Sequence, residues 1–330
     1  MGALRACGGR SADRPAPASS WSIAIELRGA GGEPVDLART LLSHGVAELP
    51  PNAIARDGLA LESVLIADDR AWLVRLTASA PGVALLRSPP GAPAPPPAAR
   101  PALVATVRHM LRLDEDLSAF FRAAAGDPTL AWATAGAGRM LRSPTVFEDL
   151  VKTICTTNCA WSATERMVGA LVADLGQVLE GAEGAGNRRA FPTPAALARA
   201  PDGFYRDRAR AGYRGPYLHA LATPVVDGRL ELEALADPAL PDEHVAERLQ
   251  SIAGVGPYAT AHMMMLLGRY RRLVLDSWTR PKYRRVSGRP RITDKGIERA
   301  FARYRAFAGL AFWLTLTEDW VSAQDPSAGP

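Results

Sequence analysis

The stretch LQSIAGVGPYATAHM, residues 249–263, decides the fold that we predict for this chain. The apolar residues before its glycines recur at the spacing of one buried helix face: Val245, Leu249 and Ile252. Gly254 and Gly256 permit a tight turn, and Pro257 is favoured in the first turn of a helix, where its missing N–H is not needed. The stretch therefore predicts two helices joined by a glycine hairpin.

A glycine turn that leads into a helix N-terminus leaves backbone N–H groups free, and such groups bind a phosphate without reading base sequence. An ordinary helix–turn–helix junction inside a core is the alternative. The spacing of the apolar residues and the two glycines favours contact with a DNA backbone. The hairpin residues that we expect at this contact are Gly254, Val255, Gly256 and Tyr258.

Asp276 follows the apolar triplet of residues 273–275, downstream of the second predicted helix. An acidic residue in this place, close to a basic cluster, is a candidate catalytic carboxylate. Its alternative role is the N-cap of a helix, for which aspartate is a favoured residue. The two roles are compatible, because a carboxylate held at a helix start is also oriented.

Basic residues are concentrated around Asp276. Residues 269–305 contain 13 Lys or Arg residues and three acids, so this segment is ten charges positive, whereas the whole chain has a net charge of +5. Lys and Arg neutralise phosphates, although a solvated helix face is the alternative explanation. The basic side chains that we expect to contact DNA are Arg280, Lys282 and Arg284.

The composition limits the class of protein. A chain of 330 residues, 48% of them hydrophobic, has enough apolar surface for one large or two modest cores. Its three cysteines, Cys7, Cys155 and Cys159, are too few for a disulfide framework or for an iron–sulfur cluster with four thiolates. No apolar run has the length of a membrane span, and residues 1–20 lack a hydrophobic signal core. We therefore expect a cytoplasmic protein.

The chain divides into a first region with strand patterns and a second with helical periodicity. In the first, residues 21–27 predict a strand, 35–43 a short helix, and 59–66 with 71–76 a hairpin around an acidic turn. The predicted parts are a disordered tail (1–20), a small α+β domain (21–87), a proline-rich linker (88–101), a helical domain (102–322) and a disordered tail (323–330). The predicted helices are 102–111, 117–125, 145–156, 160–175, 194–200, 215–223, 242–252, 257–267, 294–304 and 306–320.

The order of hairpin, helix, apolar step and Asp276 resembles the helix-hairpin-helix (HhH-GPD) DNA glycosylase superfamily. Two further segments resemble it. PTVFEDLVKTICTTN, residues 144–158, is similar to the family's helix that ends in a strand-inserting polar residue, and its last five residues resemble those of 8-oxoguanine glycosylases. GYRGPY, residues 212–217, is similar to a Gly-Tyr-Arg-x-x-Tyr segment of the same enzymes. The resemblance covers about residues 102–320, and the N-terminal region resembles the small β-rich domain of alkylbase and 8-oxoguanine glycosylases.

The resemblance implies a mainly α fold, with a two-lobed helical domain behind a small N-terminal α+β domain. It implies that Asp276 stabilises the cationic sugar and orients the attacking water after a base is flipped out of DNA. Asn158 would insert into the strand in place of the flipped base, with a helix C-cap as its alternative role. The expected walls of the base pocket are Tyr258 and His262, which share a helix face, and Phe312 and Trp313, for which core packing is the alternative.

One departure from the family pattern bears on the reaction. Members that also cut the DNA strand carry a lysine two residues beyond the second glycine, where this chain has Tyr258. Lys282 is near in sequence, but no motif places it in the site. We therefore expect a monofunctional enzyme with water as nucleophile, because no amine is placed to form a Schiff base with the sugar.

The lesion stays open between two classes of damaged purine. Alkylbase glycosylases carry an aromatic residue at the position of Tyr258, whereas the segment around Asn158 resembles 8-oxoguanine glycosylases. The alternatives to this function are a non-catalytic DNA-binding module, a bifunctional 8-oxoguanine glycosylase/lyase, and a mismatch-specific adenine or thymine glycosylase, many of which carry an iron–sulfur cluster.

The expected partner is double-stranded DNA that contains a damaged base, and the protein is expected to be a monomer associated with the nucleoid. No metal or other cofactor is expected, except that the hairpin carbonyls offer a place for a monovalent or divalent cation.

Overall fold

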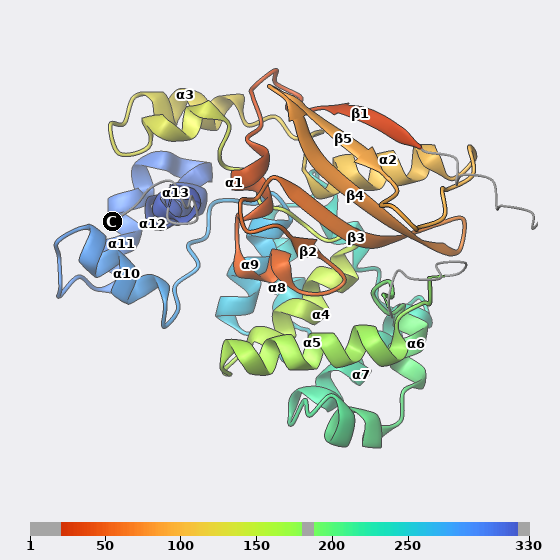
Figure 1. Cartoon of the computed structure of the whole chain (residues 1–330). Coiled ribbons are helices and arrows are strands. Elements are labelled where there is room, and N and C mark those ends of the chain that lie inside the picture. The colour runs from red at the N-terminus through yellow and green to blue at the C-terminus, as the bar shows by residue number, and fades with distance from the viewer. Residues whose placement is uncertain (1–20, 180–187, 323–330) are drawn as a thin grey trace, which may run out of the picture.

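The computed structural model describes residues 21–179 and 188–322, and it is mainly helical with one small sheet (Figure 1). This confirms the predicted fold class. The tails expected at residues 1–20 and 323–330, and with them Cys7, lie outside the described residues. No helix in the described ranges has both the length and the apolar character that a membrane span requires.

The N-terminal strands form one antiparallel sheet in the order β1-β5-β4-β3-β2. The strands are β1 Ser22–Glu26, β2 Ala53–Ile54, β3 Ala60–Ala67, β4 Arg70–Ala80 and β5 Val83–Arg87. The predicted hairpin is β3–β4, and its turn residues Asp68 and Asp69 have φ of 50° and 59°. Two positive φ values in a two-residue loop match the twist of the paired strands. The short helix α1, Leu37–Leu41, follows its N-cap Asp36.

The first long helix, α2, covers Arg100–Met110 and begins two residues before the predicted start. Pro101 lies in its first turn, where proline needs no hydrogen-bond partner for a backbone N–H. Its buried residues Leu103, Val107 and Met110 belong to the same hydrophobic cluster as the sheet. The core of the N-terminal domain therefore includes α2, so the boundary predicted at residue 102 does not separate the two cores.

The helices of the second part pack around a larger core (Figure 1). They are α3 Ser118–Ala125, α4 Val146–Thr156, α5 Trp161–Leu175, α6 Pro194–Arg199, α7 Arg214–Val226, α8 Asp242–Gln250, α9 Pro257–Leu266, α10 Thr279–Val286, α11 Asp294–Phe301, α12 Ala308–Thr317 and α13 Asp319–Ser322. Two differences from the predicted helices are found here. The helix α10 was not predicted, and the segment 306–320 forms two helices, α12 and α13, rather than one.

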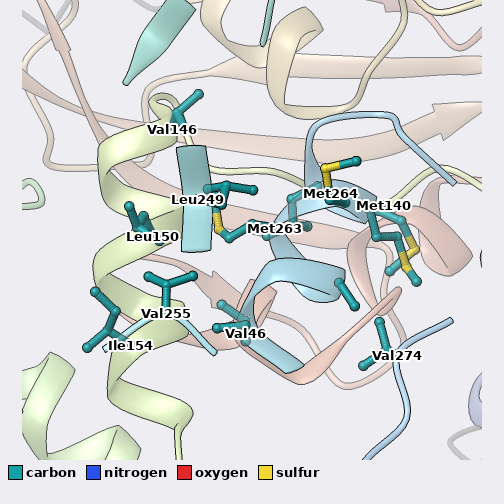
Figure 2. Close-up of a cluster of buried hydrophobic side chains, with 14 of the residues drawn as sticks. Val46, Met140, Val146, Leu150, Ile154, Leu249, Val255, Met263, Met264 and Val274 are labelled. Carbon is teal, nitrogen blue, oxygen red and sulfur yellow. The ribbon is translucent and has the colours of Figure 1, made fainter. Parts of the chain in front are cut away.

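The helix α9 lies in the middle of this core and is buried on all sides from Ala259 to Leu266. Met263 and Met264 on α9 share one buried cluster with Leu150 on α4 and Leu249 on α8 (Figure 2). Val255, at the tip of the hairpin, belongs to this cluster too. The hairpin is therefore fixed to the core by its central side chain, while its two glycines stay at the surface.

Several hydrogen bonds join the loop after α1 to the helical part, among them one from the backbone N–H of Leu141 to the Ser43 hydroxyl at 2.9 Å. His44 Nε2 lies 2.7 Å from the carbonyl oxygen of Leu141, and the Trp313 indole donates to the carbonyl of Ser43 at 2.8 Å. The Lys152 ammonium donates to the carbonyl of Leu49 at 3.4 Å. These contacts hold the N-terminal domain against α4 and α12.

Candidate active site

Three segments that are far apart in the sequence meet around one groove of about 1190 Å³. They are the C-terminal end of α4 with Asn158, the 212–217 segment, and the hairpin with the loop that carries Asp276. These are the segments singled out in the sequence, and their side chains line the groove together.

The hairpin presents its backbone to this groove for two different reasons. Gly254 has a φ of +87°, and a Cβ on it would lie 2.6 Å from the ring of Tyr217. Gly256 has an ordinary φ of −92°, and a Cβ on it would meet no atom within 4 Å. Val255 between them is 6% exposed and anchors the turn. Of the two hairpin glycines, the fold thus requires only Gly254. The absence of a side chain at Gly256 leaves the backbone open to an approaching ligand.

Asp276 lies on the wall of the groove, in the turn before α10. Its Oδ1 accepts hydrogen bonds from the backbone N–H groups of Trp278, at 2.8 Å, and Thr279, at 2.7 Å. The Thr279 hydroxyl accepts a hydrogen bond from the backbone N–H of Asp276 at 2.8 Å. This reciprocal arrangement fixes the carboxylate, as in a helix cap. Within the described ranges, Oδ2 has no hydrogen bond, so one oxygen is oriented and the other is available.

Asn158 is exposed on the rim of the groove, two residues after the end of α4, with a φ of +49°. The carbonyl of Thr157 beside it accepts hydrogen bonds from the guanidinium of Arg214 and, at 3.4 Å, from the hydroxyl of Tyr213. The same guanidinium lies 4.5 Å from the centre of the Tyr213 ring. The 212–217 segment therefore holds the end of α4 that presents Asn158.

Tyr258, in the first turn of α9, lines the groove between the end of α4 and Asp276. Its hydroxyl lies 3.5 Å from the hydroxyl of Thr156. Burial raises the pKa of its phenol, so the side chain stays neutral at physiological pH. The groove thus has a flat, uncharged aromatic wall next to the carboxylate.

The other three predicted pocket residues do not line this groove. His262 is buried behind Tyr258, with the two rings nearly parallel and their centroids 6.2 Å apart. Phe312 has no exposed surface and packs against Tyr283 and Phe301, because α12 is apolar on all sides. The prediction for Phe312 as a pocket wall is therefore wrong.

Trp313 is also buried, and its indole is tied to the Ser43 carbonyl. Its ring contacts Trp278 and Trp320, at centroid distances of 5.8 Å and 5.9 Å. Trp278 is the most exposed member of this cluster, at 40%, and it follows Asp276 by two residues. We did not predict Trp278, although its nearness to Asp276 in the sequence was a usable signal.

The three predicted basic contacts are already bonded to other parts of the protein. Arg280 lines the groove and forms an ion pair with Asp294 at 2.9 Å. The Lys282 ammonium lies 2.6 Å from a carboxylate oxygen of Asp319, and the half-buried Arg284 guanidinium donates to the carbonyl of Ile292 at 3.5 Å. No lysine is among the described residues that line the groove.

No metal-binding cluster is found among the described residues, and of the two described cysteines Cys159 lines the groove whereas Cys155 does not. In the described ranges, no three His, Cys, Asp or Glu side chains cluster in a way that would hold a metal ion. Cys155 is fully buried, and burial raises the pKa of its thiol to about 12. The thiol is therefore protonated and unreactive.

The helical body, the preceding sheet and the glycine hairpin form a fold that this chain shares with solved DNA glycosylases. Similar solved structures include the 3-methyladenine DNA glycosylase of Archaeoglobus fulgidus, with 21% identity and a TM-score of 0.67 over 90% of this chain and 98% of that one. The 8-oxoguanine glycosylase/lyase of Clostridium acetobutylicum has 18% identity and a TM-score of 0.67 over 89% and 95% of the two chains. MBOgg1, solved with a DNA ligand, has 18% identity and a TM-score of 0.68 over 92% and 96%. No family model and no curated protein matches the sequence.

Proposed function

We propose that the protein is a monofunctional DNA glycosylase, which flips a damaged purine out of double-stranded DNA and hydrolyses its N-glycosidic bond. The observation that carries this proposal is the position of Asp276. Its carboxylate is oriented by two backbone N–H groups and lies in the same groove as the open backbone of the hairpin. Solved proteins of this fold are glycosylases for alkylated and for oxidised bases, which supports the substrate class.

The groove can bring a strand to the carboxylate. The hairpin and the N-terminus of α9 offer backbone N–H groups to a phosphate, and Gly256 leaves space for its approach. Asn158 on the rim fills the space that the flipped base vacates, and its amide can bond to the orphaned partner base. Flipping costs about a few kcal/mol, and least at a damaged pair.

The bond breaks as positive charge develops on the sugar. The Asp276 carboxylate stabilises this oxocarbenium-like state, and the effect grows where water is displaced. Its free oxygen Oδ2 accepts a proton from the attacking water. The base leaves with the bonding electrons and, where the lesion is not already cationic, takes up a proton from solvent. Water adds to C1′, and its proton passes to the carboxylate. The products are a free base and an abasic site.

The absence of an amine at the described lining of the groove supports the monofunctional reaction. Tyr258 stands where a lyase lysine would be, and the Lys282 ammonium is engaged by Asp319. Without an amine near C1′, water attacks the sugar, the base is released and the strand stays intact.

A base-release assay on labelled duplexes tests the proposal. The panel contains 3-methyladenine, hypoxanthine, 8-oxoguanine and uracil, each at one site in the duplex. We expect release of at least one purine lesion, with a strand break that appears only after alkali treatment. Tight duplex binding with no base released would identify a non-catalytic module. A protein–DNA adduct trapped by borohydride would identify a bifunctional enzyme.

A further inference from the structure

The ion pairs of the basic segment show which cations are free to bind an external anion. Arg280 is paired with Asp294, Lys282 with Asp319, and Arg303 with Asp127. Charge-assisted bonds to these carboxylates compete with any bond to a phosphate. A DNA-binding surface on this segment therefore depends on the arginines that have no such partner.

Three of these arginines line a second cleft of about 560 Å³ beside the groove. They are Arg271, Arg272 and Arg305, and none of them forms an ion pair with another described residue. The cleft and the groove share lining residues, among them Pro257 and Tyr258, so the two are continuous.

The charge of the cleft favours an anion. Two acids line it, Asp294 and Glu298, and Asp294 is already neutralised by Arg280. Three unpaired guanidinium groups therefore face one unpaired carboxylate among the described lining residues. Guanidinium groups suit a phosphate in particular, because they offer paired N–H donors in a plane.

The backbone of Arg305 gives an independent indication that its side chain matters. Its φ of 52° and ψ of −114° fall in a region that favours glycine and is strained for residues with a Cβ. The strain lies at a kink inside the 3-10 segment Ala302–Phe307, which precedes α12, and the side chain is exposed. Glycine would fit this backbone better, so we expect the arginine side chain to have a role that offsets the strain.

We propose that Arg271, Arg272 and Arg305 bind a backbone phosphate of the DNA, next to the part of the strand that lies in the catalytic groove. The inference rests on the proposed function for its ligand, a DNA duplex. It adds a second anchoring point beyond the hairpin. Such an anchor neutralises phosphate charge whatever the base sequence, so it acts on damaged and undamaged DNA alike.

Binding of an undamaged duplex, measured by fluorescence anisotropy between about 50 and about 200 mM salt, tests the inference. We compare the full-length protein with Arg271→Ala/Arg272→Ala, Arg305→Ala and Arg305→Gly. Arg87→Ala, an exposed arginine on β5 of the N-terminal sheet, is the matched control. Log affinity decreases with log salt concentration, and the magnitude of this negative slope should decrease by about 0.9 for each phosphate that the variant no longer neutralises. The control should keep the slope of the wild type.

The two Arg305 variants separate the side chain from the strain. Both variants should lose the contact between residue 305 and the phosphate. Arg305→Gly should melt at a higher temperature than Arg305→Ala, because glycine relieves the backbone strain at this position. Arg271→Lys/Arg272→Lys, which keeps both charges, should bind more tightly than the double alanine variant. A thermal melt of each variant checks that it is folded.

Three results would overturn the inference: unchanged salt slopes in both alanine variants, wild-type affinity in Arg305→Gly, or an equal loss in Arg87→Ala. If the wild type releases a lesion base while the alanine variants bind like it, the second anchor fails and the proposed function stands. If the wild type neither binds duplex DNA nor releases any base, both fail together.

Discussion

His44 and His262 lie side by side at the boundary between the two parts of the molecule, with ring centroids 5.4 Å apart. Burial is the main cause that lowers the pKa of His44 to about 3, and the neighbouring His262 lowers it further. Burial also lowers the pKa of His262 to about 4. Both rings are therefore neutral in the folded protein at physiological pH.

This pair predicts a loss of stability in acid. The unfolded chain, where a histidine has a pKa of 6.5, binds more protons than the folded chain once the pH falls below that value. The free energy of unfolding should decrease as the pH falls from 6.5 towards the folded values, by about 2 kcal/mol per histidine at about pH 5. Burial likewise lowers the pKa of His109 to about 4, so His262→Phe removes one of three such groups and should reduce the decrease by about 2 kcal/mol at about pH 5.

Urea unfolding at about pH 7, pH 6 and pH 5 measures the effect. His244→Phe, at an exposed position on α8, is the control and should leave the pH dependence unchanged. Asp149, whose pKa burial raises to about 6, titrates in every variant and therefore cancels in the comparison. An equal pH dependence in the wild type and His262→Phe would contradict the prediction.

Within the hairpin, one glycine is needed for folding and the other for the approach of a ligand. Gly254→Ala places a Cβ against the Tyr217 ring in a strained conformation and should cost about 1–3 kcal/mol of unfolding free energy. Gly256→Ala should cost only about 0.5 kcal/mol, because its Cβ meets open space. That Cβ nevertheless stands where we expect a phosphate, so duplex affinity should fall by roughly tenfold, as for the loss of one charge-assisted hydrogen bond.

The two alanine variants are each other's control in a thermal melt and a duplex-binding titration. Gly256→Ala should have a melting temperature close to that of the wild type but a lower affinity for duplex DNA. Normal binding by Gly256→Ala would show that the hairpin does not approach a phosphate at this residue.

The elements that the sequence predicted well are those with a strong local signal. The β3–β4 hairpin, α4, α5 and α9 have clear apolar periodicity and turn or cap residues, and the three helices were placed within one residue. The turn of the hairpin was placed correctly, although β4 extends to Ala80, beyond the predicted end at residue 76. The helix α10 was missed because five of its eight residues are proline, lysine or arginine and only Thr279 and Tyr283 are buried. This helix begins where the Asp276 carboxylate accepts two backbone N–H groups. The sequence analysis considered such a capping role for Asp276 only as the alternative to a catalytic one.

The candidate site was predictable to the extent that local motifs define it. The hairpin, Asn158, Tyr258 and Asp276 were found in the sequence and meet at one groove. Phe312 and Trp313 were misplaced relative to this groove, since a helix that is apolar on all sides carries no signal of which face is turned where. The ion pairs of Arg280 and Lys282 join residues 14 and 37 positions apart, so spacing did not reveal them.

At the scale of the whole molecule, the N-terminal domain is joined to the helical part at the loop that carries Ser43 and His44. The sheet and α2 form one core, and the helices around α9 form the other. The groove belongs to the second core, with its walls on α4, α7, the hairpin and the Asp276 loop. The function that we propose therefore depends on distant segments being held together by packing, with one carboxylate placed among them.

Base release by Asp276→Asn is the most direct test of that account. Asparagine has nearly the same shape and also caps a helix start, so the variant should fold and bind duplex DNA like the wild type. Without the negative charge, base release in a single turnover should fall by about 100- to 1000-fold. Asp237→Asn is the matched control, because Asp237 is exposed and its Oδ1 likewise accepts a backbone N–H two residues ahead. Release by Asp276→Asn at the rate of the wild type and of Asp237→Asn would contradict the account.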